Sequence, residues 1–199
     1  MAKKLPKIIS EEEFLKLHDA AKKIESKSKK RKHTIREFRL AMILGFYSGL
    51  RISEVVGFED RDKTLASRHG KGPTQIIWRV PKLTKDNIED SHIRINSGKG
   101  QKDRIVPRPR LLNQNAIDML PLKIGRRSIQ RFITKLGKDV LGKEISFHTL
   151  RHGFVTLCIE KGMDLHEVQM FAGHSRLDTT GIYLHANPKK ALDKYKDLF

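Results

Sequence analysis

The hydrophobic pattern at the start of the chain predicts a capped helix. Apolar side chains recur every three or four positions from Phe14 to Ile24, and Ser10 and Glu13 ahead of them have the spacing of a capping box. We therefore expect a first helix over about residues 11–25. The basic segment "SKSKKRKH" that follows fits two interpretations, a solvated linker or a segment that contacts phosphate.

The pattern then changes twice. Thr34 is placed to cap a second helix that runs to a break at Gly49, and its apolar centre, "LAMILGFY", is expected to be buried. The segments "TQIIWRV" and "DSHIRINSGKGQKDRIVPR" read as β structure that turns at residues 97–100. Helical spacing returns and predicts helices over about residues 113–119, 126–138, 147–161, 164–172, 176–184 and 188–197, with glycines 162 and 173 as stops. The expected fold is α+β and mostly helical, with a small antiparallel sheet carrying a β-hairpin.

The chain is strongly basic. Its 199 residues include 41 Lys and Arg against 23 Asp and Glu, a formal charge of +18. This excess favours a polyanion as partner, with nucleic acid the first candidate, although composition does not separate DNA from RNA. The single cysteine, Cys158, excludes an internal disulfide and thiolate-rich zinc sites, and it favours a cytoplasmic location. Since no apolar run approaches the roughly 18 residues that span a bilayer, no membrane partner is expected.

The segment "HTLRH" opens the helix predicted over residues 147–161. His148 and His152 have the i, i+4 spacing of helical zinc sites, but the glutamate of the H-E-x-x-H motif is absent and Arg151 would repel a metal ion. His148 and Arg151 lie in the first turns of the helix, where the helix dipole favours anions, and a guanidinium can donate two hydrogen bonds to a phosphate. The sequence therefore favours a phosphate site over a metal site.

Three further segments carry candidate chemistry, and each has a simpler structural interpretation. Arg51 in "SGLRISEVVGF" follows a buried helix, and its spacing from Glu54 also fits a structural ion pair. Lys99 in "GKGQKDRIVP" lies at the predicted hairpin tip, where a lysine is usually just solvated. His174 and Tyr183 lie in "MFAGHSRLDTTGIYLH", where a tyrosine alone is more often a packing residue than a nucleophile.

Together and in this order, these segments resemble the catalytic domain of the tyrosine recombinase (phage integrase) family, which includes the Xer-type recombinases. The motifs that carry the resemblance are "GLRISE", "GKGQKDRIVP", "HTLRH", "GH" and "TTGIYLH". The resemblance implies that residues 1–199 form a single catalytic domain in the family's fold, and that the N-terminal core-binding domain of most members is absent. It also implies double-stranded DNA as the partner and a homotetramer on DNA. Because the core-binding domain is expected to be absent, we expect a monomer when the protein is free.

The activity that the resemblance implies is site-specific DNA recombination or integration, in which strands are cut and rejoined without a metal or other cofactor. The implied catalytic residues are Arg51, Lys99, His148, Arg151, His174 and Tyr183. Tyr183 would attack the phosphodiester and form a 3′-phosphotyrosyl intermediate. The two arginines and His174 would bind the non-bridging oxygens.

In the same scheme, Lys99 would protonate the 5′-oxygen that leaves, and His148 would assist proton removal from Tyr183. Lys82, Lys85 and Lys102 are nearby alternatives to Lys99, while His152 is expected to be structural and Glu54 to position Arg51. The candidates for contact with the DNA backbone, each of which also fits a solvated face, are Lys102, Arg104, Arg126, Arg127 and Arg131.

Two other functions stay open at this point. One is strand relaxation of the type IB topoisomerase kind, which uses the same cleavage chemistry without strand exchange. The other is an integrase-derived DNA-binding protein without recombination activity. Tyr183 argues against the second function, because binding alone would not require it.

Overall fold

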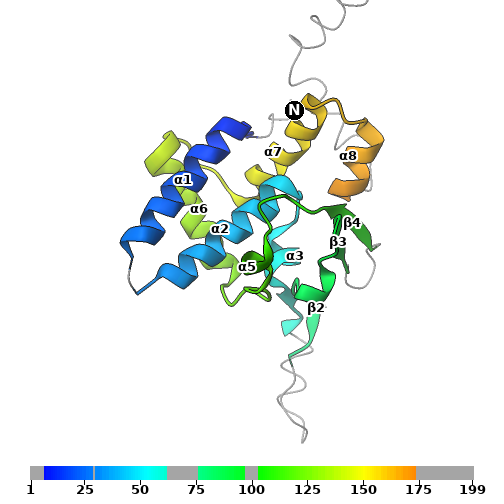
Figure 1. The fold of residues 1–199 in the computed structure, drawn as a ribbon, viewed down its shortest axis with the longest axis horizontal. Helices are drawn as coiled ribbons and strands as arrows, with labels where there is room; N and C mark the ends of the chain where they lie inside the picture. The colour runs from blue at the N-terminus through cyan, green and yellow to red at the C-terminus, as the bar shows by residue number, and fades with distance from the viewer. Residues whose placement is uncertain (1–6, 29, 62–75, 97–102, 174–199) are drawn as a thin grey trace, which may run out of the picture.

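A computed structural model of the chain describes residues 7–28, 30–61, 76–96 and 103–173. Figure 1 shows α1, α2 and α6 side by side and α7 next to α2, whereas α8 lies at the other side of the molecule, beside strands β3 and β4. The helices are α1 (Glu11–Lys27), α2 (Lys32–Tyr47), α3 (Ile52–Val56), α5 (Gln114–Ile117), α6 (Arg126–Leu141), α7 (Phe147–Glu160) and α8 (Leu165–Ala172). The strands are β1 (Phe58–Glu59), β2 (Trp78–Val80), β3 (His92–Ile95) and β4 (Arg104–Pro107), and a 3₁₀ turn, η1, spans Lys85–Asn87.

Several helix ends follow from their capping residues. The capping box before α1 is present: the Ser10 hydroxyl accepts from the Glu13 N–H at 3.1 Å, and the Glu13 carboxylate accepts from the Ser10 N–H at 3.3 Å. Gly173 ends α8 in the left-handed conformation, with φ of 58°. The prediction that Thr34 caps α2 is wrong, because this helix begins two residues earlier and places Thr34 inside its first turn.

The crossing of α2 and α7 forms the centre of the core. The ring of Phe147 lies on Gly45, where a Cβ atom would come within 2.9 Å of it, and the ring of Phe46 lies on Gly153, where a Cβ atom would come within 2.5 Å. Each helix thus provides a glycine for an aromatic ring of the other. Phe14 of α1 stacks on Phe46 at a ring-centroid distance of 4.2 Å and extends this core to the first helix. The backbone near Arg151 is therefore held by close packing.

The β structure forms two small antiparallel sheets where a single sheet was expected. Strand β1, which the sequence pattern did not predict, pairs with β2, and β3 pairs with β4. In the second sheet the buried Ile93 and Ile95 lie opposite Val106 and Arg104. Arg104 is therefore on the inward face of β4, with Val106, while Ile105 between these two residues is half exposed.

Several predicted elements lie outside the described residues. These are the hairpin tip and the helices predicted over 176–184 and 188–197. Within the residues that the structure does describe, none of the helices has both the length and the apolar character needed to cross a membrane.

Candidate active site

Arg51 is the residue immediately before α3, at the point where the chain leaves the buried core. Its side chain is 32% exposed and forms an ion pair with Glu54 at 2.8 Å. The backbone N–H of Arg51 also donates to Glu54 at 2.7 Å, and the second terminal nitrogen of its guanidinium donates to the carbonyl oxygen of Gly173 at 2.8 Å. The ion pair that the spacing of these residues suggested is thus present, and the guanidinium still reaches solvent.

Arg151 lies in α7 and is almost completely buried, with 2% of the residue exposed. Its two terminal nitrogens donate to the carbonyl oxygens of Gly49 and Ala172, one before Arg51 in the chain and one at the end of α8. Burial, followed by the positive charge of Arg51, lowers the pKa of Arg151 to about 9. Arg151 thus stays protonated at neutral pH, and an anion beside it would be strongly favoured.

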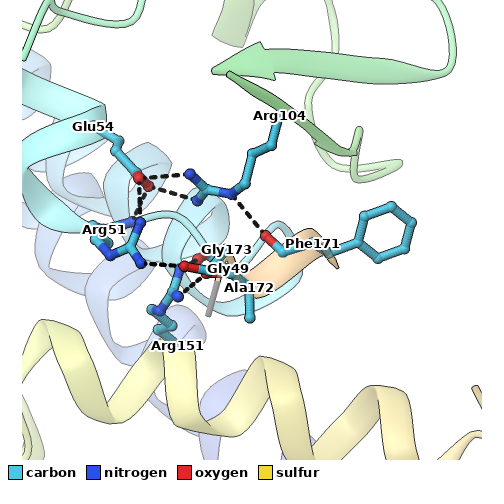
Figure 2. A network of polar contacts seen from close by, with 8 residues as sticks. All are labelled: Gly49, Arg51, Glu54, Arg104, Arg151, Phe171, Ala172 and Gly173. Carbon is cyan, nitrogen blue, oxygen red and sulfur yellow. Dashed lines mark hydrogen bonds and ion pairs between the residues drawn. The ribbon is translucent and has the colours of Figure 1, made fainter. Parts of the chain in front are cut away.

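The end of α8 is where the three arginines meet. Figure 2 shows three consecutive carbonyl oxygens that accept hydrogen bonds from three different guanidinium groups. Phe171 accepts from Arg104, Ala172 from Arg151 and Gly173 from Arg51. The last carbonyl groups of a helix have no partner within the helix and carry partial negative charge, so they suit cations. We call Arg51, Arg104 and Arg151 the arginine cluster.

Glu54 provides the negative side chain of this cluster. Its carboxylate is 3% exposed and accepts from both terminal nitrogens of Arg104, at 2.8 and 2.9 Å, in addition to Arg51. Burial by itself would raise the pKa of Glu54, but the hydrogen bonds and charges of Arg104 and Arg51 outweigh it, and the pKa lies below 4.5. Glu54 is therefore ionised at neutral pH. It bonds two of the three cations, Arg51 and Arg104, so the cluster keeps a net positive charge and is suited to an anion.

The sequence analysis placed Arg104 among the candidates for DNA-backbone contact, and the structure shows a different set of contacts. Only 10% of its side chain is exposed, and the guanidinium is engaged by Glu54 and Phe171. A DNA contact for Arg104 stays a prediction that these contacts do not favour. The signal for its inward position was the strand pattern, since Arg104 is two residues from the buried Val106.

His148 lies next to the arginine cluster on the first turn of α7. It is exposed on one side, and its ring packs edge-on against His152 at 4.3 Å between ring centroids. Partial burial, followed by the charges of Arg151 and Arg51, lowers the pKa of His148 below 6.5. The imidazole is thus neutral at pH 7, which is the form that can accept a proton.

The other predicted catalytic residues, Lys99, His174 and Tyr183, lie outside the described residues, as does Lys102. Two alternatives to Lys99 can be placed. The ammonium of Lys82 lies over the ring of Trp78 at 5.1 Å, and that of Lys85 pairs with Asp118 at 3.0 Å. These contacts do not favour either lysine as the general acid, and Lys99 stays the prediction.

Arg126, Arg127 and Arg131 form an exposed basic stripe at the start of α6. The guanidinium of Arg126 lies over the ring of Phe58, 4.3 Å from its centroid. Exposure keeps these side chains available to phosphate, and DNA contact remains a prediction for them. Across the described ranges, no group of three or more His, Cys, Asp or Glu side chains is arranged to hold a metal ion.

Comparison with known proteins agrees with this geometry. The phage integrase family matches residues 118–190. Tyrosine recombinase XerC of Thermodesulfovibrio yellowstonii is 30% identical over 194 residues, which cover 92% of this chain and 60% of that protein. The family match includes α7, which carries Arg151, and α8, at whose end the three carbonyl groups lie.

Solved structures share the fold. The XerH site-specific recombinase bound to palindromic difH substrate, a post-cleavage complex, superimposes with a TM-score of 0.65 and 21% identity, covering 97% of this chain and 53% of that one. The catalytic domain of bacteriophage HP1 integrase gives a TM-score of 0.52 with 20% identity, covering 89% of this chain and 86% of that one. The chain thus has the fold of these recombinase and integrase domains. The sequence matches show that it belongs to the tyrosine recombinase (phage integrase) family. It spans about 60% of the length of the XerC relative.

Proposed function

We propose that this chain is the catalytic part of a site-specific recombinase that cuts and rejoins double-stranded DNA through a phosphotyrosyl intermediate. The observation that carries the proposal is the convergence of Arg51 and Arg151. These residues are far apart in the sequence, yet both donate to adjacent carbonyl groups at the end of α8. Two guanidinium groups on rigid backbone can bind the two non-bridging oxygens of one phosphodiester.

The carbonyl oxygens of Ala172 and Gly173 occupy positions that phosphate oxygens could take, because each is a partially negative atom that accepts a hydrogen bond from a guanidinium. A phosphodiester can compete for these donors with a full negative charge. Arg51 is the more accessible of the two, and we expect it to exchange Gly173 for phosphate. Charge that develops on the phosphoryl oxygens in the transition state is then stabilised by groups that are already oriented.

The chemical step in this proposal is a transesterification. The phenolic oxygen of Tyr183 attacks phosphorus, the bond from phosphorus to the 5′-oxygen breaks, and the product is a 3′-phosphotyrosyl ester with a free 5′-hydroxyl. His148, which is neutral at pH 7, takes the phenolic proton, and Lys99 gives a proton to the departing oxygen. His174 adds a hydrogen bond to the phosphoryl oxygens. Reversal of the step on another strand rejoins the DNA without an external energy source.

The partner in this proposal is duplex DNA, in keeping with the net charge of +18 and with the XerH structure, which is a complex with its difH substrate. We further propose a tetramer on DNA, a monomer in its absence, and action in the cytoplasm. Light scattering with and without DNA measures the assembly. A stable tetramer without DNA would contradict this part of the proposal.

Covalent capture on nicked DNA tests the function. A pool of nicked duplexes with randomised sequence, in which the cleaved fragment diffuses away, is incubated with the protein in excess EDTA and run on a denaturing gel. We expect a protein–DNA adduct that Tyr183→Phe abolishes. An adduct that persists in Tyr183→Phe would remove this tyrosine as the nucleophile, and one that requires added Mg²⁺ would contradict the metal-free step.

Tyr47 provides the matched control, because it is one of the chain's three tyrosines and its surroundings are described. Burial, followed by the hydrogen bond to Glu11 at 3.1 Å, raises the pKa of Tyr47 to about 12, which makes it a poor nucleophile. We expect Tyr47→Phe to form the adduct at the wild-type rate. Loss of the adduct in both variants would indicate a general effect of removing a tyrosine hydroxyl.

A further inference from the structure

We propose that Arg104 is a positioning residue of the candidate active site, which orients Glu54 against Arg51 and ties the β3–β4 sheet to the end of α8. The proposal rests on the proposed function, since it concerns the same site. It assigns to Arg104 a role inside the protein in place of contact with DNA.

The contacts of Arg104 fix it in one orientation. Its two terminal nitrogens donate to the two oxygens of Glu54 at 2.8 and 2.9 Å, and its Nε donates to the carbonyl oxygen of Phe171 at 2.9 Å (Figure 2). A two-point contact between guanidinium and carboxylate sets direction as well as distance. With 10% of the side chain exposed, water offers little competition for these bonds.

Glu54 transmits this orientation to Arg51. Each oxygen of the carboxylate accepts one bond from Arg104 and one from Arg51, through the Arg51 backbone N–H at one oxygen and its guanidinium at the other. If Arg104 were removed, the full charge of Glu54 would act on Arg51 and hold its guanidinium away from an incoming phosphate. Arg104 thus both orients the carboxylate and weakens its hold on Arg51.

Arg104 also connects two elements that lie close in the sequence to other predicted catalytic residues. It lies on β4, five positions after Lys99 in the sequence, and it contacts α8, whose capping Gly173 directly precedes His174. Gly173 packs against the guanidinium so closely that a Cβ atom would lie 3.0 Å from Cδ and Nε of Arg104. A single side chain therefore joins α3, β4 and α8 around the arginine cluster.

The test separates positioning from DNA binding by measuring two quantities. A duplex captured by the wild-type protein from the nicked pool is used to measure the single-turnover cleavage rate at saturating DNA and, separately, the Kd for DNA. We expect Arg104→Met to cleave on the order of 100-fold more slowly, as a displaced reactive group does, with an unchanged Kd. The matched control is Arg94→Met, since Arg94 is on the paired strand and bonds Glu89 at the surface; it should cleave at the wild-type rate.

A conservative variant covers the case in which Arg104→Met does not fold. Arg104→Lys keeps the charge beside Glu54 but cannot donate to both carboxylate oxygens and to Phe171, so we expect slow cleavage here also. In the double variant Arg104→Met/Glu54→Gln, the rate loss should be smaller than the product of the two single losses, because both act on Arg51. Wild-type rates in the folded Arg104 variants, or a weaker Kd with an unchanged rate, would overturn the proposal.

Failure of the proposed function is recognised separately, because the wild-type protein would then capture no DNA. The positioning role is measured without DNA by NMR, from the Nε–H signal of Arg51 in ¹⁵N-labelled protein. We expect Arg104→Met to shift this signal and speed its exchange with water, and Arg94→Met to leave it unchanged. An Arg51 signal that is the same in Arg104→Met and wild type would overturn the proposal.

Discussion

Replacing Glu54 with glutamine should destabilise the fold far more than the same change at a surface ion pair. The carboxylate accepts four hydrogen bonds of 2.7–2.9 Å from Arg51 and Arg104. The amide of glutamine replaces one acceptor oxygen by a donor, so two of the four bonds are lost and the two guanidinium groups lose their shared negative charge. Breaking a buried ion pair costs about 3–5 kcal/mol, and we expect the lower end because Arg51 is partly exposed.

The assay is urea unfolding followed by circular dichroism, with Glu89→Gln as the control. Glu89 pairs with Arg94 at 2.8 Å, but the two side chains are 43% and 56% exposed, and such pairs contribute less than about 1 kcal/mol. A loss of about 3 kcal/mol in a chain of this size corresponds to a fall in Tm of roughly 6–12 °C. A Glu54→Gln variant as stable as Glu89→Gln would refute the view that Glu54 holds the cluster together.

Wild type and Glu54→Gln also give a test in which the pH dependence of stability has a defined sign. The pKa of Glu54 in the fold is lower than its ordinary value of 4.5, so the stability that it contributes is fully present above pH 4.5. That stability is lost as the pH falls through the pKa of the folded state. The difference in unfolding free energy between wild type and Glu54→Gln should therefore shrink below pH 4.5, and a difference that grows there would contradict the assignment.

Three further predictions concern the core, the cysteine and the histidine. Gly153→Ala places a Cβ atom 2.5 Å from the ring of Phe46 and should cost about 1–3 kcal/mol in urea unfolding, whereas Gly125→Ala, with nothing within 4 Å, should cost less than about 1 kcal/mol. Partial burial raises the pKa of Cys158 to about 11, so iodoacetamide should label it roughly 100-fold more slowly than free cysteine at neutral pH, and rapid labelling would contradict the raised pKa. At subsaturating DNA, cleavage should slow as the pH falls through the pKa of His148, with a midpoint below 6.5; an acid limb centred above that value would count against His148 as the base.

Local pattern was enough to predict the described helices other than α3, while those predicted over 176–184 and 188–197 lie outside the described residues. The capping box at Ser10 and the glycine stop at Gly173 depend only on neighbouring residues, and both were found as expected. The error at Thr34 has a local cause as well, because the basic residues before it continue the helix instead of remaining a linker. The spacing of Arg51 and Glu54 also predicted their ion pair.

The arrangement of the site depends on contacts between distant parts of the chain. Arg51 reaches the carbonyl group of Gly173 across 122 positions, and no pattern within a short window indicates such a contact. The inward position of Arg104 depends on the register that places it opposite Ile95. The family motifs brought Arg51 and Arg151 into one hypothesis, but no motif predicted that they donate to adjacent carbonyl groups, Gly173 and Ala172, at the end of α8.

The most direct test of the proposed function is to identify the amino acid that is joined to DNA. The captured adduct is digested with protease and nuclease, and the modified peptide is sequenced by mass spectrometry. The account predicts a nucleotide linked through its 3′-phosphate to Tyr183, in the peptide that contains "TTGIYLH". A nucleotide on Tyr47, Tyr195 or any residue other than Tyr183 would contradict it.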